Sequence, residues 1–89
     1  TVIEHFSNSK NIWLNRSAIL FQLGYKQNTN SYILFSECIK HAQSNEFFIQ
    51  KAIGWALREY GKTNLEAVKT FVAQTQLKPL SKKEALKNL

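Results

Sequence analysis

The 89-residue sequence contains no aspartate and no methionine, and it has only one cysteine and one proline. The single cysteine, Cys38, excludes an internal disulfide framework and is typical of a reducing, cytoplasmic compartment. The longest apolar run, residues 52–57, is much shorter than the roughly 20 residues that cross a membrane. No signal-peptide pattern opens the chain. We therefore expect a cytoplasmic protein with no membrane partner.

Acidic residues are scarce. Twelve lysines and arginines face six acidic residues, all of them glutamates, which gives a net charge of +6 and a pI near 9.7. This excess favours nucleic acid or another anionic surface as the partner, although it says nothing about the fold. The cations are spread along the chain, which argues against a disordered basic arm.

The length and composition bound the domain count. With 89 residues, 44% of them hydrophobic, the chain is one globular domain or a piece of one. Residues 1–6 read like the end of a helix that has already begun, and no initiator methionine precedes them. We therefore expect residues 1–89 to form a single domain that is a portion of a longer protein.

Helix start and stop signals divide the chain, and no segment shows the sustained alternation of a β-strand. Asn8 and Ser9 end the first helix, and Gly24 follows a second helix over about 11–23. A third helix is predicted over 31–43, with Thr29 or Asn30 as its cap, and a fourth begins after Ser44 or Asn45 and ends at Gly61. A fifth is predicted over 65–76, because residues 63–66 match a capping box. Beyond Pro79, a second capping box at 81–84 predicts a short final helix. Short connections favour antiparallel neighbours, so the predicted fold class is all-α.

A faint repeat relates the second helix to the fourth. Residues 16–23 align with residues 50–57 at an offset of 34, and Trp13 aligns with Phe47. Helix pairs that recur at this distance are typical of HEAT and armadillo solenoids. We expect a fragment of such an α-solenoid, built from antiparallel helix pairs with a concave basic surface. We expect Trp13 to belong to its core.

Residues 47–60 carry two stripes when they are placed on a helix of 100° per residue. One stripe has the spacing of a buried face and comprises Ile49, Ala52, Ile53, Ala56, Leu57 and Tyr60. The adjoining stripe mixes cations with large aromatic rings and comprises Phe48, Lys51, Trp55, Arg58 and Lys62. A guanidinium one turn from an indole suits a polyanion with a flat group beside its charges. Two interpretations remain open: contact with nucleic acid, or a wider buried face past which the cations reach solvent.

No catalytic or metal-binding motif stands out. Residues 61–63 (Gly-Lys-Thr) resemble the end of a phosphate-binding loop, but Ala56 occupies the position of the required glycine and a helix precedes it. His5 and His41 have no cysteine or carboxylate at ligand spacing, and Cys38 lies on an apolar helical face. The six glutamates are scattered. We expect no active site, metal or cofactor within these residues.

Three blocks together resemble a known family: residues 13–20 (WLNRSAIL), 47–60 (FFIQKAIGWALREY) and 80–87 (LSKKEALK). The chain is similar to the C-terminal part of the DNA alkylation repair enzymes, which are helical-repeat DNA glycosylases. The resemblance implies HEAT-like helix pairs whose concave face holds duplex DNA. It also implies hydrolysis of the N-glycosidic bond of N3- or N7-alkylated purines, which are cationic and therefore good leaving groups.

The resemblance assigns roles to individual residues. Trp55 matches a tryptophan that contacts the sugar-phosphate at the lesion, and Arg58 and Arg16 match arginines that contact the DNA backbone. The mixed stripe alone adds three more candidate DNA-binding residues, Lys51, Phe48 and Lys62. The family uses a catalytic aspartate upstream of this segment, and this chain contains none. By the family route, the 89 residues alone should therefore be inactive.

Two departures and two alternatives accompany this interpretation. Asn15 stands where an arginine is common beside Arg16, and Leu65 stands where a proline is common at a helix start, a neutral change. A non-enzymatic helical-repeat scaffold would bind nucleic acid or protein through the same face. A shortened chain could also pair with itself through apolar surface at a cut solenoid end.

Overall fold

The computed structural model describes residues 2–87. This part of the chain is all-α, as predicted, and contains no strand. Its elements are α1 (Val2–Asn8), α2 (Ile12–Leu20), the short 3-10 helix η1 (Lys26–Asn28), α3 (Ser31–His41), α4 (Phe47–Gly61), α5 (Leu65–Gln74) and α6 (Pro79–Ala85). No helix of the described part is both long and apolar enough to cross a membrane.

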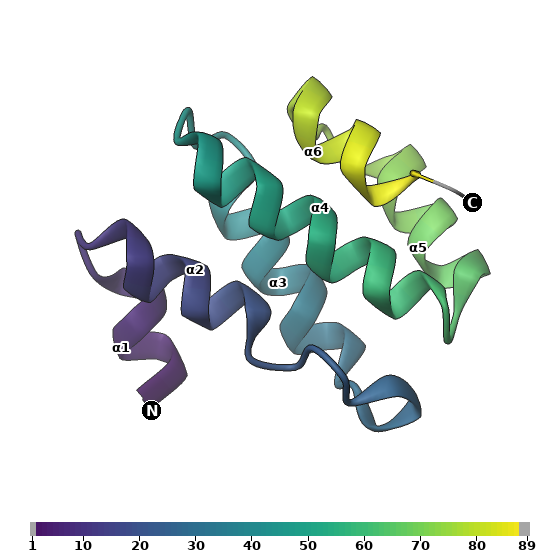
Figure 1. The fold of residues 1–89 in the computed structure, drawn as a ribbon, viewed down its shortest axis with the longest axis horizontal. Coiled ribbons are helices and arrows are strands. Elements are labelled where there is room, and N and C mark those ends of the chain that lie inside the picture. Colours follow the sequence, from purple (N-terminus) through teal and green to yellow (C-terminus); the bar gives the residue numbers. More distant parts are fainter. Residues whose placement is uncertain (1, 88–89) are drawn as a thin grey trace.

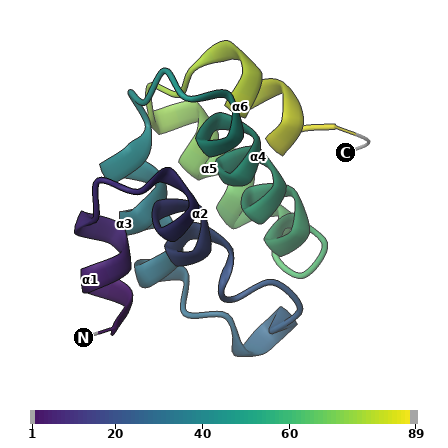
Figure 2. The same ribbon diagram turned by 60° about the vertical axis from the view of Figure 1, so that its left-hand side comes forward.

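The helices lie in two layers. Figures 1 and 2 show α2, α4 and α6 side by side in one layer, with α1, α3 and α5 behind them. Within the pairs α3–α4 and α5–α6 the chain reverses direction, as Figure 1 shows. Helix α4 lies at the centre and contacts α2, α3, α5 and α6. This arrangement of stacked antiparallel pairs is the solenoid-like fold that the repeat predicts.

The core surrounds the apolar stripe of α4. Of the predicted buried face, Ile49, Ala52, Ile53, Ala56 and Leu57 are all buried. They pack with buried side chains of the other helices, which include Ile19, Leu34, Cys38, Val68, Phe71, Val72 and Ala85. Each fully buried valine, leucine or isoleucine side chain stabilises the fold by about 1.5–3 kcal/mol. The position of α4 in the middle of the fold therefore follows from its apolar stripe.

Several helix boundaries follow the predicted signals. Asn30 caps α3, one of the two residues predicted there, and Asn64 caps α5 in place of Thr63, the first residue of the predicted capping box. Each asparagine oxygen accepts a hydrogen bond from the backbone N–H three residues later, at 3.1 Å. Helix α2 is shorter than predicted, since it ends at Leu20 and a turn leads to Gly24, whose φ of +86° suits glycine. Glu46, rather than Ser44 or Asn45, precedes the first residue of α4.

The predicted capping box at residues 81–84 is wrong. Helix α6 begins at Pro79, which occupies the first helical position, so Ser81 and Glu84 lie inside the helix. Ser81 is fully buried and its hydroxyl donates a hydrogen bond of 3.1 Å to the backbone carbonyl of Gln50 on α4. The local pattern Ser-x-x-Glu matched a cap, but packing against α4 uses both polar side chains for tertiary contacts.

Asn15 fixes α1 against α2. Its side-chain amide donates hydrogen bonds to the backbone carbonyls of Phe6 (2.9 Å), Ser7 (3.1 Å) and Ser9 (2.9 Å). The carbonyls of Phe6 and Ser7 lie in the last turn of α1, where C=O groups have no partner within the helix, and Ser9 follows that turn. The residue that departs from the basic family pattern therefore has a structural role in this chain.

Candidate nucleic-acid interface

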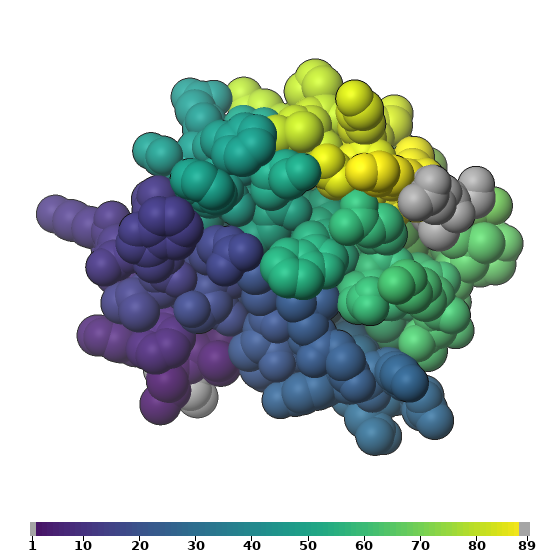
Figure 3. Space-filling model, in the orientation of Figure 1, coloured from purple at the N-terminus to yellow at the C-terminus, as the bar shows by residue number. Residues whose placement is uncertain are grey.

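A groove of about 300 Å³ opens on the layer formed by α2, α4 and α6. Figure 3 shows this face, with α2, α4 and α6 exposed across it. The groove is lined by Arg16 of α2, Glu84 of α6, and Phe47, Phe48, Lys51, Ala52, Trp55 and Arg58 of α4. Five of the six predicted DNA-binding residues therefore line one hollow: Arg16, Phe48, Lys51, Trp55 and Arg58.

Arg16 and Trp55 join α2 to α4 across the groove. The guanidinium carbon of Arg16 lies 5.9 Å from the centroid of the Trp55 ring, within the range of a cation–π contact. Trp55 remains 41% exposed and Phe48 remains 48% exposed. The alternative in which these two rings widen the buried face is therefore wrong, because both present a large part of their surface to solvent.

Glu84 neutralises part of the charge in the groove. Its Oε1 accepts from the Lys51 ammonium at 2.7 Å, and its Oε2 accepts from Nη1 of Arg58 at 2.9 Å. These hydrogen bonds, first that from Lys51 and then that from Arg58, lower the pKa of the Glu84 carboxyl below its usual value. The carboxylate is charged at neutral pH, so the four ionic groups that line the groove carry a net charge of +2.

Exposed aromatic rings form one rim of the groove. The Trp13 and Phe48 rings lie 5.1 Å apart between centroids, and the Phe47 and Phe48 rings lie 5.3 Å apart. The prediction that Trp13 belongs to the core is wrong, because this side chain is 53% exposed. On α2 it shares a helical face with Arg16, one turn away, whereas the buried residues Ala18 and Ile19 occupy another face.

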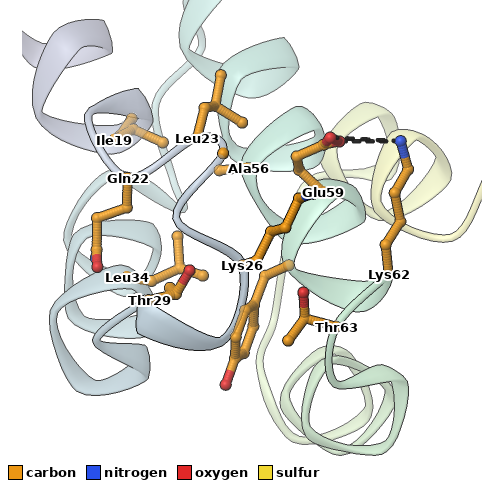
Figure 4. Close-up of a pocket in the computed structure, with 12 residues that line it drawn as sticks. Ile19, Gln22, Leu23, Lys26, Thr29, Leu34, Ala56, Glu59, Lys62 and Thr63 are labelled. Atoms are coloured by element: carbon orange, nitrogen blue, oxygen red, sulfur yellow. Dashed lines mark hydrogen bonds and ion pairs between the residues drawn. The ribbon is translucent and has the colours of Figure 1, made fainter.

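Lys62 lies outside the groove. Its side chain is 68% exposed, and its ammonium contacts Oε2 of Glu59 at 3.0 Å, one turn back on α4. Both residues border a second hollow of about 370 Å³, between the end of α4 and the turn that follows α2. Figure 4 shows the Glu59–Lys62 pair on one side of this hollow and the apolar side chains of Ile19 and Leu34 on the other.

The residues considered for thiol chemistry do not form a nucleophilic site. Cys38 is fully buried, and burial, followed by the nearby charge of Glu37, raises the pKa of its thiol. The His41 ring is engaged elsewhere, because its Nε2 lies 3.2 Å from the hydroxyl of the buried Ser7. Within residues 2–87, no three His, Cys or Glu side chains are grouped so that they could hold a metal ion.

Sequence reasoning missed three residues that line or border the groove: Glu84, Phe47 and Trp13. Glu84 was assigned to a cap because the Ser-x-x-Glu pattern is a local signature. The alignment of Trp13 with Phe47 at the repeat offset was a usable signal, since both side chains are exposed, at 53% and 54%. The alignment indicated that Trp13 and Phe47 occupy equivalent positions in the repeat, and in the structure both positions lie at the surface.

Comparisons with known proteins agree with this architecture. The sequence model of the family described as DNA alkylation repair enzyme matches residues 1–89. A solved structure from Enterococcus faecalis, described as a predicted DNA alkylation repair enzyme, is similar to the chain with a TM-score of 0.94 and 40% sequence identity. The match covers 99% of this chain and 41% of that protein. None of the curated proteins compared with the chain matches it. By sequence and by structure, the chain belongs to the DNA alkylation repair enzyme family.

Proposed function

We propose that this chain is the C-terminal, DNA-binding part of a glycosylase that excises N3- or N7-alkylated purines from duplex DNA. Membership of a DNA repair family supports DNA as the partner. The observation that carries the finer proposal is the groove between α2, α4 and α6, where Arg16, Arg58 and Trp55 lie together. The chain spans 41% of its Enterococcus relative, so the activity proposed is that of a full-length protein.

The two arginines suit a DNA backbone. Arg16 enters the groove from α2 and Arg58 enters it from α4, so two guanidinium groups on separate helices line one surface. A guanidinium pairs with phosphate oxygens in a bidentate geometry, which holds the strand in a set position. Contacts of this kind fix register and orientation without reading the base sequence. This suits an enzyme whose target is defined by damage.

Trp55 suits the chemistry of base loss. An alkylated purine that carries a positive charge leaves readily, and positive charge then grows on the sugar. The electron-rich face of an indole attracts a cation, and fixed groups aimed at developing charge lower the barrier. Trp55 already has the Arg16 guanidinium near its ring and keeps 41% of its surface exposed. In this proposal, Trp55 lies beside the sugar at the lesion.

The catalytic carboxylate comes from outside this chain in the proposal. Glu84 is the one carboxylate among the described residues that line the groove, and both of its oxygens are bonded to cations. A carboxylate held in this way is a weak proton acceptor. The resemblance implies an aspartate elsewhere in the full-length enzyme, and this chain has none.

The test is release of methylated purines from alkylated duplex DNA. We would compare the full-length natural protein with the 89-residue chain, and then measure Trp55→Ala and Arg58→Ala in the full-length protein. Lys69→Ala, on α5 in the other layer, is the control for loss of one surface cation. We expect release by the full-length protein only, a clear loss in both groove variants with the fold retained, and no loss in the control.

Other results would change the assignment. Normal release by both groove variants would remove Trp55 and Arg58 from the site. Release by neither protein would favour a non-enzymatic scaffold that uses the same groove for binding. Release by the 89-residue chain itself would show that the chemistry lies within it, and Glu84 would then be the first carboxylate to substitute.

A further inference from the structure

Helix α6 lies directly against α4 at Gly54. A β-carbon built on Gly54 would overlap the Cβ of Glu84, and it would lie 3.0 Å from the backbone oxygen of Ser81 and 3.3 Å from the backbone nitrogen of Ala85. These contacts are closer than a side chain at position 54 allows. Glycine in the middle of α4 therefore has a specific use, which is to let the backbone of α6 lie against it.

This close approach places the Glu84 carboxylate between two cations of α4. Lys51 and Arg58 lie seven positions apart on α4, which corresponds to roughly 10 Å along the helix axis. Gly54 lies between them, so a side chain from α6 that starts opposite Gly54 can reach both. The side chain of Glu84 is only 12% exposed, and each of its oxygens bonds one of the two cations.

Glu84 also fixes the orientation of Arg58 through its backbone. Nη1 of Arg58 donates to the main-chain oxygen of Glu84 at 3.2 Å in addition to the carboxylate at 2.9 Å. One nitrogen of the guanidinium is thus held by α6, while the side chain remains 27% exposed and lines the groove. The remaining N–H groups of the planar fork then have a set direction.

We propose that Glu84, delivered by the contact of α6 with Gly54, is a positioning residue that holds Arg58 and Lys51 for the DNA backbone. This inference rests on the proposed function of the groove and adds a role for α6 within it. The carboxylate lowers the net charge of the groove, so it weakens general attraction to DNA. In return, two long flexible side chains are ordered before DNA arrives, which reduces the entropy lost on binding.

The experiment is a double-mutant cycle in the full-length protein between Glu84→Gln and Arg58→Ala. Glutamine has one side-chain oxygen, so it can accept from one cation only, while its amide turns a donor toward the other. With Arg58 present, Glu84→Gln should slow single-turnover base release at saturating DNA by on the order of tenfold, because displacement of such a group by about 1 Å can cost a hundredfold. In the Arg58→Ala background, the same change should have a smaller effect, because only the contact of Glu84 with Lys51 then remains to be lost.

Binding separates positioning from charge. Affinity for undamaged duplex DNA should change little in Glu84→Gln, because the positive charge that the groove gains offsets the side-chain order that it loses. Glu59→Gln is the matched control, because Glu59 pairs with Lys62 outside the groove and its loss adds the same charge. Gly54→Ala changes no charge and displaces α6, so it should slow base release as Glu84→Gln does. A merely structural role of Glu84 would instead lower the melting temperature of Glu84→Gln and reduce its DNA binding and its rate of base release together.

Three outcomes would overturn the inference. Equal slowing by Glu84→Gln with and without Arg58 would show that Glu84 does not act through Arg58. Unchanged release in Glu84→Gln, together with a loss in Arg58→Ala, would refute the positioning role and leave the proposed function of the groove intact. Unchanged release in Arg58→Ala would refute the positioning role and remove Arg58 from the site, whereas the proposed function fails only if the full-length protein releases no base.

Discussion

The Arg16 guanidinium carbon lies 5.9 Å from the centroid of the Trp55 ring, so a cation of α2 and an aromatic residue of α4 share one surface. The two residues are far apart in the sequence, and no single sequence motif contains both of them. Their contact places a charge that suits a phosphate beside a flat ring that suits a sugar or base. This pair is the part of the groove that most directly supports contact with a nucleic acid.

Salt dependence tests the contribution of Arg16. If Arg16 neutralises one phosphate, Arg16→Ala should make the slope of log K against log salt concentration less negative by about 0.9. The measurement is duplex binding by fluorescence anisotropy over a range of salt concentrations. Lys69→Ala, which removes one cation from α5 in the other layer, should leave the slope close to that of the parent protein. Equal slopes for all three proteins would exclude a phosphate contact at Arg16.

Lys62 should contribute less to binding than the groove residues. Its ammonium contacts the carboxylate of Glu59, which offsets its positive charge, and its side chain is 68% exposed. Interactions of such exposed charges are weak because water and salt screen them. We expect Lys62→Ala to reduce duplex affinity by a smaller factor than Arg58→Ala, measured in the same binding assay. A larger loss at Lys62 would move the DNA path toward the second hollow, between the end of α4 and the turn after α2.

Two glycines of α4 should respond to alanine with opposite signs. At Gly54 the added methyl group meets α6, and overpacking of this kind costs about 1–3 kcal/mol. At Gly61 the nearest side-chain atom to an added Cβ is 3.8 Å away, on Val68, so Gly61→Ala should be neutral or stabilise by about 0.5–1 kcal/mol. Urea unfolding of both variants measures the difference. A stabilised Gly54→Ala variant would contradict the close contact with α6.

His41 should make stability depend on pH. Burial lowers the pKa of the His41 imidazole below 6.5, and the charge of Lys40 lowers it too, while the carboxylate of Glu37 opposes them. As pH falls below 6.5, the unfolded chain takes up a proton before the folded protein does. The contribution of His41 to the free energy of unfolding should therefore be highest above pH 6.5. It should decrease as the pH falls from 6.5 to the pKa of His41 in the folded protein.

Replacement of His41 checks this pH effect. His41→Gln should flatten the loss of unfolding free energy below pH 6.5, measured by urea titration at several pH values. His5→Gln is the matched control, because His5 is exposed and should leave the dependence on pH in place. An unchanged pH profile in His41→Gln would assign the dependence to another group.

Cys38 should be inert while the protein is folded. The side chain is fully buried, and burial raises the pKa of its thiol, so reactive thiolate is absent at neutral pH. We expect modification by a thiol reagent, followed by mass spectrometry of the peptide that contains Cys38, only at the rate at which the protein unfolds. Rapid modification under native conditions would contradict the burial of this residue.

The sequence by itself determined the features that depend on neighbouring residues. The all-α class, the apolar stripe of α4 and the cap at Asn30 were predicted, and the start of α5 was predicted to within one residue, because helix periodicity and capping involve residues within one or two turns. The mixed stripe with Trp55 and Arg58 was also visible, since residues three or four apart share a helical face. These signals need no knowledge of what packs against the helix.

Tertiary structure alone decided which helices bring their side chains to the groove. Glu84 matched a local cap, yet it contacts Arg58 because Gly54 lets α6 lie against α4. Trp13 was assigned to the core, yet it lies on the rim because Ala18 and Ile19 form the buried face of α2. Arg58 and Glu84, which meet across α4 and α6, are separated by 26 positions in the sequence. Their contact depends on the packing of whole helices, which no short pattern encodes.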